Sequence, residues 1–171
     1  MKRKQLFRLC LTGLFAALIW ITTAYLHIPS HTGYTHVGDA FLYLAACLLP
    51  LPYAACAGVV GAVLADCLTG FAVWAPASAV IKAVTALFFT SRSKRILAVR
   101  NRWAVLPSAA VCTVGYYLYE ALITGNFLAP LAGIPGYLTQ AVLSSVLFIA
   151  LGLALDNANF KTHFINGGHN A

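Results

Sequence analysis

The sequence predicts an all-α integral membrane protein, a compact bundle of six transmembrane helices with both termini in the cytoplasm. Hydrophobic residues make up 61% of the 171 residues and charged residues only 9%, whereas a soluble domain usually carries about 25% charged residues. Long apolar segments alternate with short polar ones, and a spanning helix needs about 20 mostly apolar residues. We therefore expect a single membrane domain over residues 1–171.

Six apolar segments are expected to form the helices. They cover about residues 5–26, 39–49, 53–70, 74–91, 103–125 and 136–155. The first segment begins like a signal peptide, but its apolar run continues to Leu26 without a small-residue cleavage site, so we expect it to remain as a membrane helix. The second is short and ends before Pro50 and Pro52, because proline lacks an amide donor and clashes with the preceding turn.

The basic residues gather in three places that six spans would put on one side of the membrane. Four precede or begin the first helix, five lie between the fourth and fifth helices, and Lys161 follows the sixth. The other three loops, about 27–38, 71–73 and 126–135, contain no lysine or arginine. Because basic loops stay in the cytoplasm, both termini are expected there, in the plasma membrane. The net charge of +7 is then explained without a nucleic-acid partner.

Four polar side chains within the apolar segments lie at similar depth. They are Asp66, Lys82, Glu120 and Gln140, and at about 1.5 Å per residue each lies roughly 6–12 Å inside the outer helix ends. An ionisable residue in a membrane costs about 2.5–3.5 kcal/mol on insertion scales, so it is a functional-site hypothesis. This one-sided layer predicts a pocket that opens to the outside. Lys82 is expected to pair with Asp66 or Glu120 when the pocket is empty, and a purely structural ion pair is the alternative.

Aromatic residues and an outer loop add candidates for ligand contacts. Trp74 and Tyr116 lie beside the polar stripes, where they could stack on a planar heterocycle, although an interfacial aromatic belt would also place them there. His36 and Asp39 flank Gly38 where the second helix begins. Asp39 could instead cap that helix, and the glycine-containing loop could close over the pocket as a lid.

The first helix carries small residues at two pairs of positions four apart. The pairs are Thr12 with Ala16 and Gly13 with Ala17. Small residues at this spacing let another helix approach closely. Packing within the protein's own bundle and docking of an external partner both remain open.

Several chemistries have no counterpart in the sequence. There is no Gly-rich phosphate-binding loop, no His, Cys and acid cluster with metal-ligand spacing, and no serine with an evident histidine partner. We therefore expect no enzyme activity, no cofactor and no metal.

Two strings of the sequence resemble the substrate-binding S components of energy-coupling factor (ECF) vitamin transporters. They are GYTHVGDAFLYLAACLLP at residues 33–50 and GAVLADCLTGFAVWAPASAVIKA at residues 61–83. The chain looks most like the branch that contains hydroxymethylpyrimidine, pyridoxine, riboflavin and proposed queuosine-precursor carriers. The resemblance implies a ligand in the outer half, beneath the first loop. It also implies that small residues of the first helix dock on a transmembrane T subunit driven by two ATPases.

Three functions remain open from the sequence. The leading hypothesis is an S subunit that binds a small planar vitamin or vitamin-like heterocycle and delivers it to an ATP-driven module. A self-sufficient proton-coupled transporter that uses Asp66 or Glu120 is the first alternative. A membrane scaffold without transport activity is the second.

Overall fold

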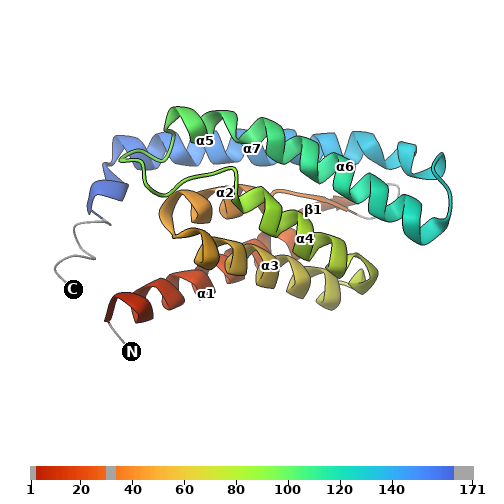
Figure 1. Cartoon of the computed structure of the whole chain (residues 1–171), viewed down its shortest axis with the longest axis horizontal. Coiled ribbons are helices and arrows are strands. Elements are labelled where there is room, and N and C mark those ends of the chain that lie inside the picture. The colour runs from red at the N-terminus through yellow and green to blue at the C-terminus, as the bar shows by residue number, and fades with distance from the viewer. Residues whose placement is uncertain (1–2, 30–33, 164–171) are drawn as a thin grey trace.

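The computed structural model describes residues 3–29 and 34–163, which form helices and one short hairpin (Figure 1). The helices are α1 (Arg3–Ala24), α2 (Asp39–Leu48), α3 (Leu51–Leu68), α4 (Ala75–Ala86), α5 (Val99–Trp103), α6 (Val105–Thr124) and α7 (Ile134–Asn157). Two 3-10 turns, η1 (Ala72–Trp74) and η2 (Ala129–Gly133), precede α4 and α7. The strands β1 (His27–Pro29) and β2 (Tyr34–His36) pair antiparallel.

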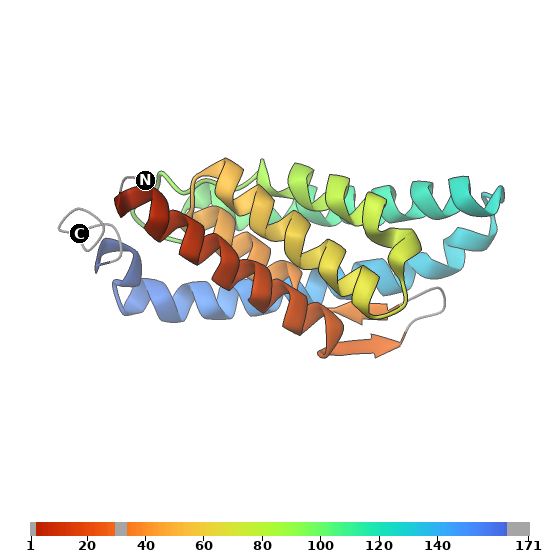
Figure 2. The same ribbon diagram turned by 90° about the horizontal axis from the view of Figure 1, so that it is seen from below.

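The helices form two outer layers with two short helices between them. The pair α1 and α3 makes one layer, and α6 and α7 make the other, preceded by α5 (Figure 1). Between them, α4 packs on both α3 and α6, while α2 contacts α1, α3 and α7. Figure 2 shows α1 and α3 side by side, with the β1–β2 hairpin following the end of α1. The short helix α2 is therefore the centre of the core, and eight of its ten residues are buried.

The close approach of α1 and α3 depends on small residues. A side-chain carbon added at Gly61 of α3 would lie 2.6 Å from the backbone oxygen of Ala16 and 2.8 Å from Cβ of Ile19. Thr12 and Ala16 are each only 7% exposed, so this face of α1 packs within the bundle. Gly13 and Ala17, one residue further along, lie on a neighbouring face and are exposed, and nothing lies within 4 Å of a carbon added at Gly13.

Most predicted helix positions agree with the structure, but the fourth segment ends early. It was expected over 74–91 and stops at Ala86. The chain beyond it leaves the helix because the buried side chain of Asn101 binds it: Oδ1 accepts from the amide of Thr90, and Nδ2 donates to the carbonyls of Thr90 and Ile96. These bonds replace the partners that further helical turns would supply.

Two other short elements were not expected. The basic loop contains the helix α5, and the outer loop contains the β1–β2 hairpin. The predicted break at the proline pair is confirmed, because α2 ends at Leu48 and α3 starts at Leu51 with Pro52 in its first turn. Proline is tolerated there because the first turn of a helix has no internal partner for its amides.

Three helical segments of the described chain are long and apolar enough to cross a membrane. They are Arg3–Ala24, Leu51–Leu68 and Ala129–Asn157, and two shorter apolar helices are Asp39–Leu48 and Ala72–Ala86. Large apolar side chains are also exposed on the surface, with Leu122 at 75% and Leu128 at 77%. A soluble protein rarely exposes so much apolar surface. The helix α6 has the length for a span, but Tyr116, Tyr117 and Glu120 make it more polar.

A buried lysine lies at the end of the bundle where α7 terminates. Asp156 fixes the chain before α5, since its two carboxylate oxygens accept from the amides of Ile96 at 2.7 Å and Leu97 at 2.9 Å. Lys161 is only 2% exposed, and its ammonium group makes no hydrogen bond within the described chain. Burial therefore lowers the pKa of Lys161 below its ordinary value, and nearby Cys47 and Asp156 offset this only in part.

The lowered pKa of Lys161 predicts a pH-dependent stability. Between the lowered pKa and the ordinary value of 10.5, the unfolded chain binds more protons at Lys161 than the folded chain, so stability should rise with pH. We expect the thermal midpoint of unfolding in detergent to rise as the pH is raised toward 10.5, and the Lys161→Met variant to lose this part of the rise. Equal slopes for the wild type and the variant would contradict the assignment.

Candidate functional site

The central contact of the site is a buried ion pair between α2 and α4. Nζ of Lys82 lies 2.6 Å from Oδ1 of Asp39. Lys82 is 2% exposed and Asp39 is 3% exposed, so neither charge is solvated by water. Such a pair is stable only when further hydrogen bonds satisfy the remaining polar atoms.

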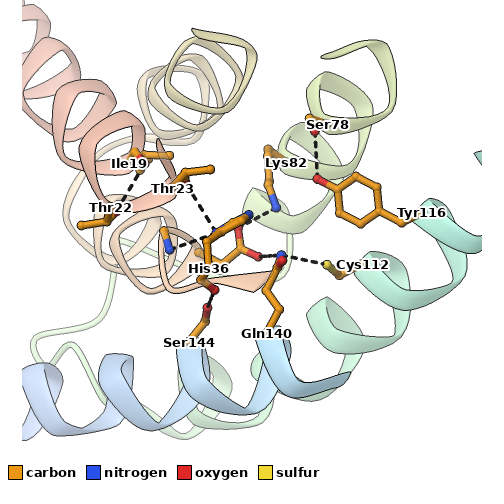
Figure 3. Close-up of polar contacts among 12 residues, drawn as sticks. Ile19, Thr22, Thr23, His36, Ser78, Lys82, Cys112, Tyr116, Gln140 and Ser144 are labelled. Atoms are coloured by element: carbon orange, nitrogen blue, oxygen red, sulfur yellow. Dashed lines mark hydrogen bonds and ion pairs between the residues drawn. The ribbon is translucent and has the colours of Figure 1, made fainter. Parts of the chain in front are cut away.

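Gln140 of α7 supplies the second partner of the carboxylate. Its Nε2 donates to Oδ2 of Asp39 at 3.0 Å, and it also lies 3.5 Å from Sγ of Cys112 on α6. Figure 3 shows the side chains of Lys82, Cys112 and Gln140 converging from three helices. Oδ1 of Asp39 is thus paired with an ammonium group and Oδ2 accepts from an amide, and four helices meet at one point.

The predicted partner of Lys82 was wrong. The sequence favoured Asp66 or Glu120, whereas the structure pairs Lys82 with Asp39. Asp39 does not cap α2 either, because the cap residue is Gly38 and no side-chain cap bond forms. The physical reason is the shortness of α2: with ten residues, its first turn lies deep in the bundle, at the level of Lys82.

Aromatic rings form a wall beside the ion pair, centred on Tyr116 of α6. Nζ of Lys82 lies 5.5 Å from the ring centroid of Tyr116, within the range of a cation–π contact. Tyr137 stacks on Tyr116 at 5.5 Å, and Trp74 meets it edge-on at 5.9 Å. The hydroxyl groups of Tyr116 and Ser78 are 2.9 Å apart (Figure 3), which fixes the orientation of the central ring.

The other two predicted acids interact with residues of this aromatic wall. Glu120 is 5% exposed, and its Oε2 accepts a hydrogen bond of 2.8 Å from the hydroxyl of Tyr137. Asp66 of α3 is 6% exposed and lies close enough to Tyr116 to interact with it electrostatically. Both acids therefore flank the site without making its central contact.

The β1–β2 hairpin covers the site through His36 and Thr35. Nδ1 of His36 accepts from the amide of Gly38 at 3.1 Å and lies 3.5 Å from Oγ1 of Thr23 (Figure 3). The backbone oxygen of His36 accepts from Ser144 at 3.4 Å, and Thr35 donates to the carbonyl of Gly136 at 3.2 Å. These contacts tie the hairpin to α1 and α7.

The structure thus gathers most of the predicted site residues and adds two that were missed. Asp39, Lys82, Gln140, Tyr116 and His36 form the centre, with Trp74, Glu120 and Asp66 around it. The missed residues are Cys112 and Thr23. Cys112 lies one helical turn before Tyr116, so the spacing of four along α6 could have identified it.

The central polar groups of the site bind one another, as Lys82 and Gln140 both contact the Asp39 carboxylate. Within the described residues, no group of three His, Cys, Asp or Glu could hold a metal ion. A planar molecule with adjacent hydrogen-bond donors and acceptors could exchange bonds with Asp39, Lys82 and Gln140 while stacking on the aromatic wall.

Comparison with known proteins identifies the family. A family model described as ECF-type riboflavin transporter, S component, matches residues 4–157, which reach from α1 to the end of α7. Among curated proteins, none is significantly similar to the chain. The family consists of multi-pass membrane subunits of transporters and not of enzymes, in agreement with the expected all-helical membrane class. Because the match covers nearly all of its helical structure, the chain belongs to the S components of ECF-type riboflavin transporters, as their substrate-binding subunit.

Proposed function

We propose that this S component binds a small planar vitamin at the Asp39–Lys82 pair and delivers it to an ATP-driven module. The observation that carries the proposal is the buried pair itself, at 2.6 Å, with Gln140 bound to its carboxylate and the Tyr116 ring beside its ammonium group. A membrane protein retains charged side chains in its interior chiefly for function. Riboflavin, pyridoxine and hydroxymethylpyrimidine are the candidate ligands.

Ligand binding would proceed by exchange of hydrogen bonds. Asp39 offers acceptor oxygens, while Lys82 and Gln140 offer donors. A heterocycle with a donor beside an acceptor can donate to the carboxylate and accept from one of the donors, so that no buried charge is left without a partner. The Tyr116–Tyr137 stack and Trp74 supply faces against which a ring can pack.

The β1–β2 hairpin is suited to be the lid of this site. Hydrogen bonds join it to α1 and α7 from Thr35 to Gly136, from Ser144 to His36 and between Thr23 and His36, and all three are longer than the contact within the ion pair. Long hydrogen bonds open at low free-energy cost. Opening would expose the first turn of α2, and with it Asp39, to the outside.

The distribution of charge supports six spans with both termini in the cytoplasm. The start of α1 and the end of α7 lie at the same end of the bundle (Figure 1). Ten of the eleven basic residues lie in residues 2–8, 92–102 and 161, and basic segments remain on the cytoplasmic side. This arrangement in the plasma membrane turns the hairpin and the ion pair outward.

The exposed small residues of α1 are the proposed contact with a transmembrane T subunit, which two ATPases would drive. Of the two pairs predicted, Thr12 and Ala16 are buried, whereas Gly13 and Ala17 are exposed. Only the second pair therefore leaves room for another helix to approach closely.

The first prediction tests the pair as a binding site. The double variant Asp39→Asn/Lys82→Met removes both charges and leaves no buried ion unpaired, so it should fold with about the stability of the wild type. We expect it to bind the ligand about 100-fold or more weakly, as measured by isothermal titration with riboflavin, pyridoxine and hydroxymethylpyrimidine. Arg102→Gln, an exposed change in α5, is the control. Wild-type affinity in the double variant would contradict the proposal.

The second prediction tests the docking face. Gly13→Leu or Ala17→Leu should prevent copurification with the T subunit and the ATPases, because a large side chain keeps the helices apart, while ligand affinity stays unchanged. Val114→Leu, at an exposed position of α6, should leave assembly intact. Normal assembly of both α1 variants, or loss of ligand binding with assembly intact, would show that this face is not the docking surface.

A further inference from the structure

We propose that the loop between α4 and α5 binds the phosphate of an anionic phospholipid whose acyl chains lie along α5 and α6. Two features carry this inference: a basic loop, residues 91–95, and the exposed apolar stripe that follows it. Neither feature belongs to the vitamin site, so the inference is independent of which vitamin binds. In the orientation proposed above, the lipid belongs to the cytoplasmic leaflet.

One buried side chain holds both ends of the basic loop. Asn101 is fully buried. Its Oδ1 accepts from the amide of Thr90 at 2.8 Å, and its Nδ2 donates to the carbonyls of Thr90 at 3.0 Å and Ile96 at 2.8 Å. Oδ1 of Asp156 also accepts from the amide of Ile96, at 2.7 Å. The ends of residues 91–95 are therefore fixed before any ligand arrives, which lowers the entropy cost of binding.

The loop carries three cations without acidic partners. Arg92, Lys94 and Arg95 are exposed, and within the described residues none of them forms an ion pair. Of the four acidic residues in the chain, three lie around the vitamin site. Both oxygens of the fourth, Asp156, already accept from backbone amides. Three uncompensated cations on a fixed loop favour a phosphate, whose oxygens accept several charge-assisted hydrogen bonds.

An exposed apolar stripe begins directly after this loop. Residues three or four apart share one face of a helix, and the exposed residues at this spacing are Val99, Trp103, Leu106 and Ala110. Ala104, which joins α5 to α6, has right-handed helical backbone angles, so the two helices follow one another along the bundle (Figure 1). At about 1.5 Å per residue the stripe covers roughly 16 Å, close to half of the hydrocarbon thickness of a bilayer.

An anionic phospholipid matches both features at once. Its phosphate lies on the loop while its chains pack along the stripe, whereas a free phosphate or an acidic cytoplasmic protein would use only the loop. Trp103, which is 66% exposed, lies at the junction of the two, and tryptophan is enriched at the membrane interface. Basic segments beside a membrane are attracted to anionic headgroups, so a lipid with net negative charge is preferred.

This surface lies away from the proposed T-subunit contact. That contact is on α1, which forms one outer layer with α3, whereas α5 and α6 belong to the other outer layer (Figure 1). A lipid on α5 and a T subunit on α1 can therefore be bound at the same time. The first basic segment, at the start of α1, contains Arg3 and Lys4 within the helix itself and has no clamped loop, so it offers a matched comparison.

The test measures which lipids the purified full chain retains. Protein in a neutral detergent is incubated with equal amounts of phosphatidylglycerol and phosphatidylcholine that carry the same acyl chains, and the retained lipids are quantified by mass spectrometry. We expect a preference of about fivefold or more for phosphatidylglycerol. Glycerol 3-phosphate, which has the phosphate without the chains, should not displace the lipid. Equal retention of the two lipids, or displacement by glycerol 3-phosphate, would overturn the proposal.

Substitutions in the loop locate the bound lipid. Arg92→Gln/Lys94→Gln/Arg95→Gln should lower the preference about threefold or more. These side chains are exposed and the clamping residues stay in place, so the thermal midpoint in lipid-free detergent should match that of the wild type. An unchanged preference in this variant would show that the lipid binds elsewhere.

A second triple variant controls for total charge. Lys2→Gln/Arg3→Gln/Lys4→Gln removes the same number of charges from the first basic segment and should keep the preference of the wild type. A loss as large as that of the loop variant would mean that the preference reflects net charge alone, which would overturn the assignment.

The fluorescence of Trp103 gives a second measurement on the unaltered loop. Its signal is the difference between the full chain and the Trp103→Phe variant, both in nanodiscs of phosphatidylcholine that contain a minor share of lipid with brominated chains, which quench tryptophan on contact. We expect brominated phosphatidylglycerol to quench Trp103 about twofold or more strongly than brominated phosphatidylcholine at the same mole fraction. Equal quenching by the two lipids would contradict the proposed site.

Discussion

A carboxylate and an ammonium group held 2.6 Å apart in the interior constrain the rest of this protein. Moving two charges out of water costs several kcal/mol for each ion, and the pair recovers this only with good geometry and satisfied hydrogen bonds. Three features produce that geometry. Gln140 donates to the carboxylate, and the short helix α2 places Asp39 at the depth of Lys82. The packing of α2 against α1, α3 and α7 holds it there.

The two ends of the bundle are held together in different ways. At the end where α7 terminates, Asp156 and Asn101 each make several bonds to the chain around α5, which makes that end rigid. At the other end, Asn126 accepts from the amides of Leu128 and Ala129, whereas the hairpin is joined to α7 by longer bonds from Thr35 to Gly136 at 3.2 Å and from Ser144 to His36 at 3.4 Å. We therefore expect local opening to cost less at the hairpin than at the end held by Asp156.

Helical periodicity was enough to predict the long helices and the residues of the polar layer. The small and polar residues of each helix recur every three to four positions, so they lie on one face once the helix forms. The partner of Lys82 could not be predicted in the same way, because it depends on where a ten-residue helix starts in space. The hairpin and α5 were not predicted. Their segments are short, and their conformation depends on tertiary contacts, such as those of Asn101, more than on the local sequence. The sequence also could not show which small-residue pair of α1 is exposed, because that depends on where α3 packs.

The identity of the acid that pairs with Lys82 is the most direct test of this account. Double-mutant cycles of unfolding in detergent would combine Lys82→Met with Asp39→Asn, Asp66→Asn and Glu120→Gln in turn, because a cycle isolates the interaction between two side chains. We expect a coupling free energy of about 1–3 kcal/mol for Asp39 and a smaller one for the other two acids. Strong coupling of Lys82 to Asp66 or Glu120, with none to Asp39, would contradict it.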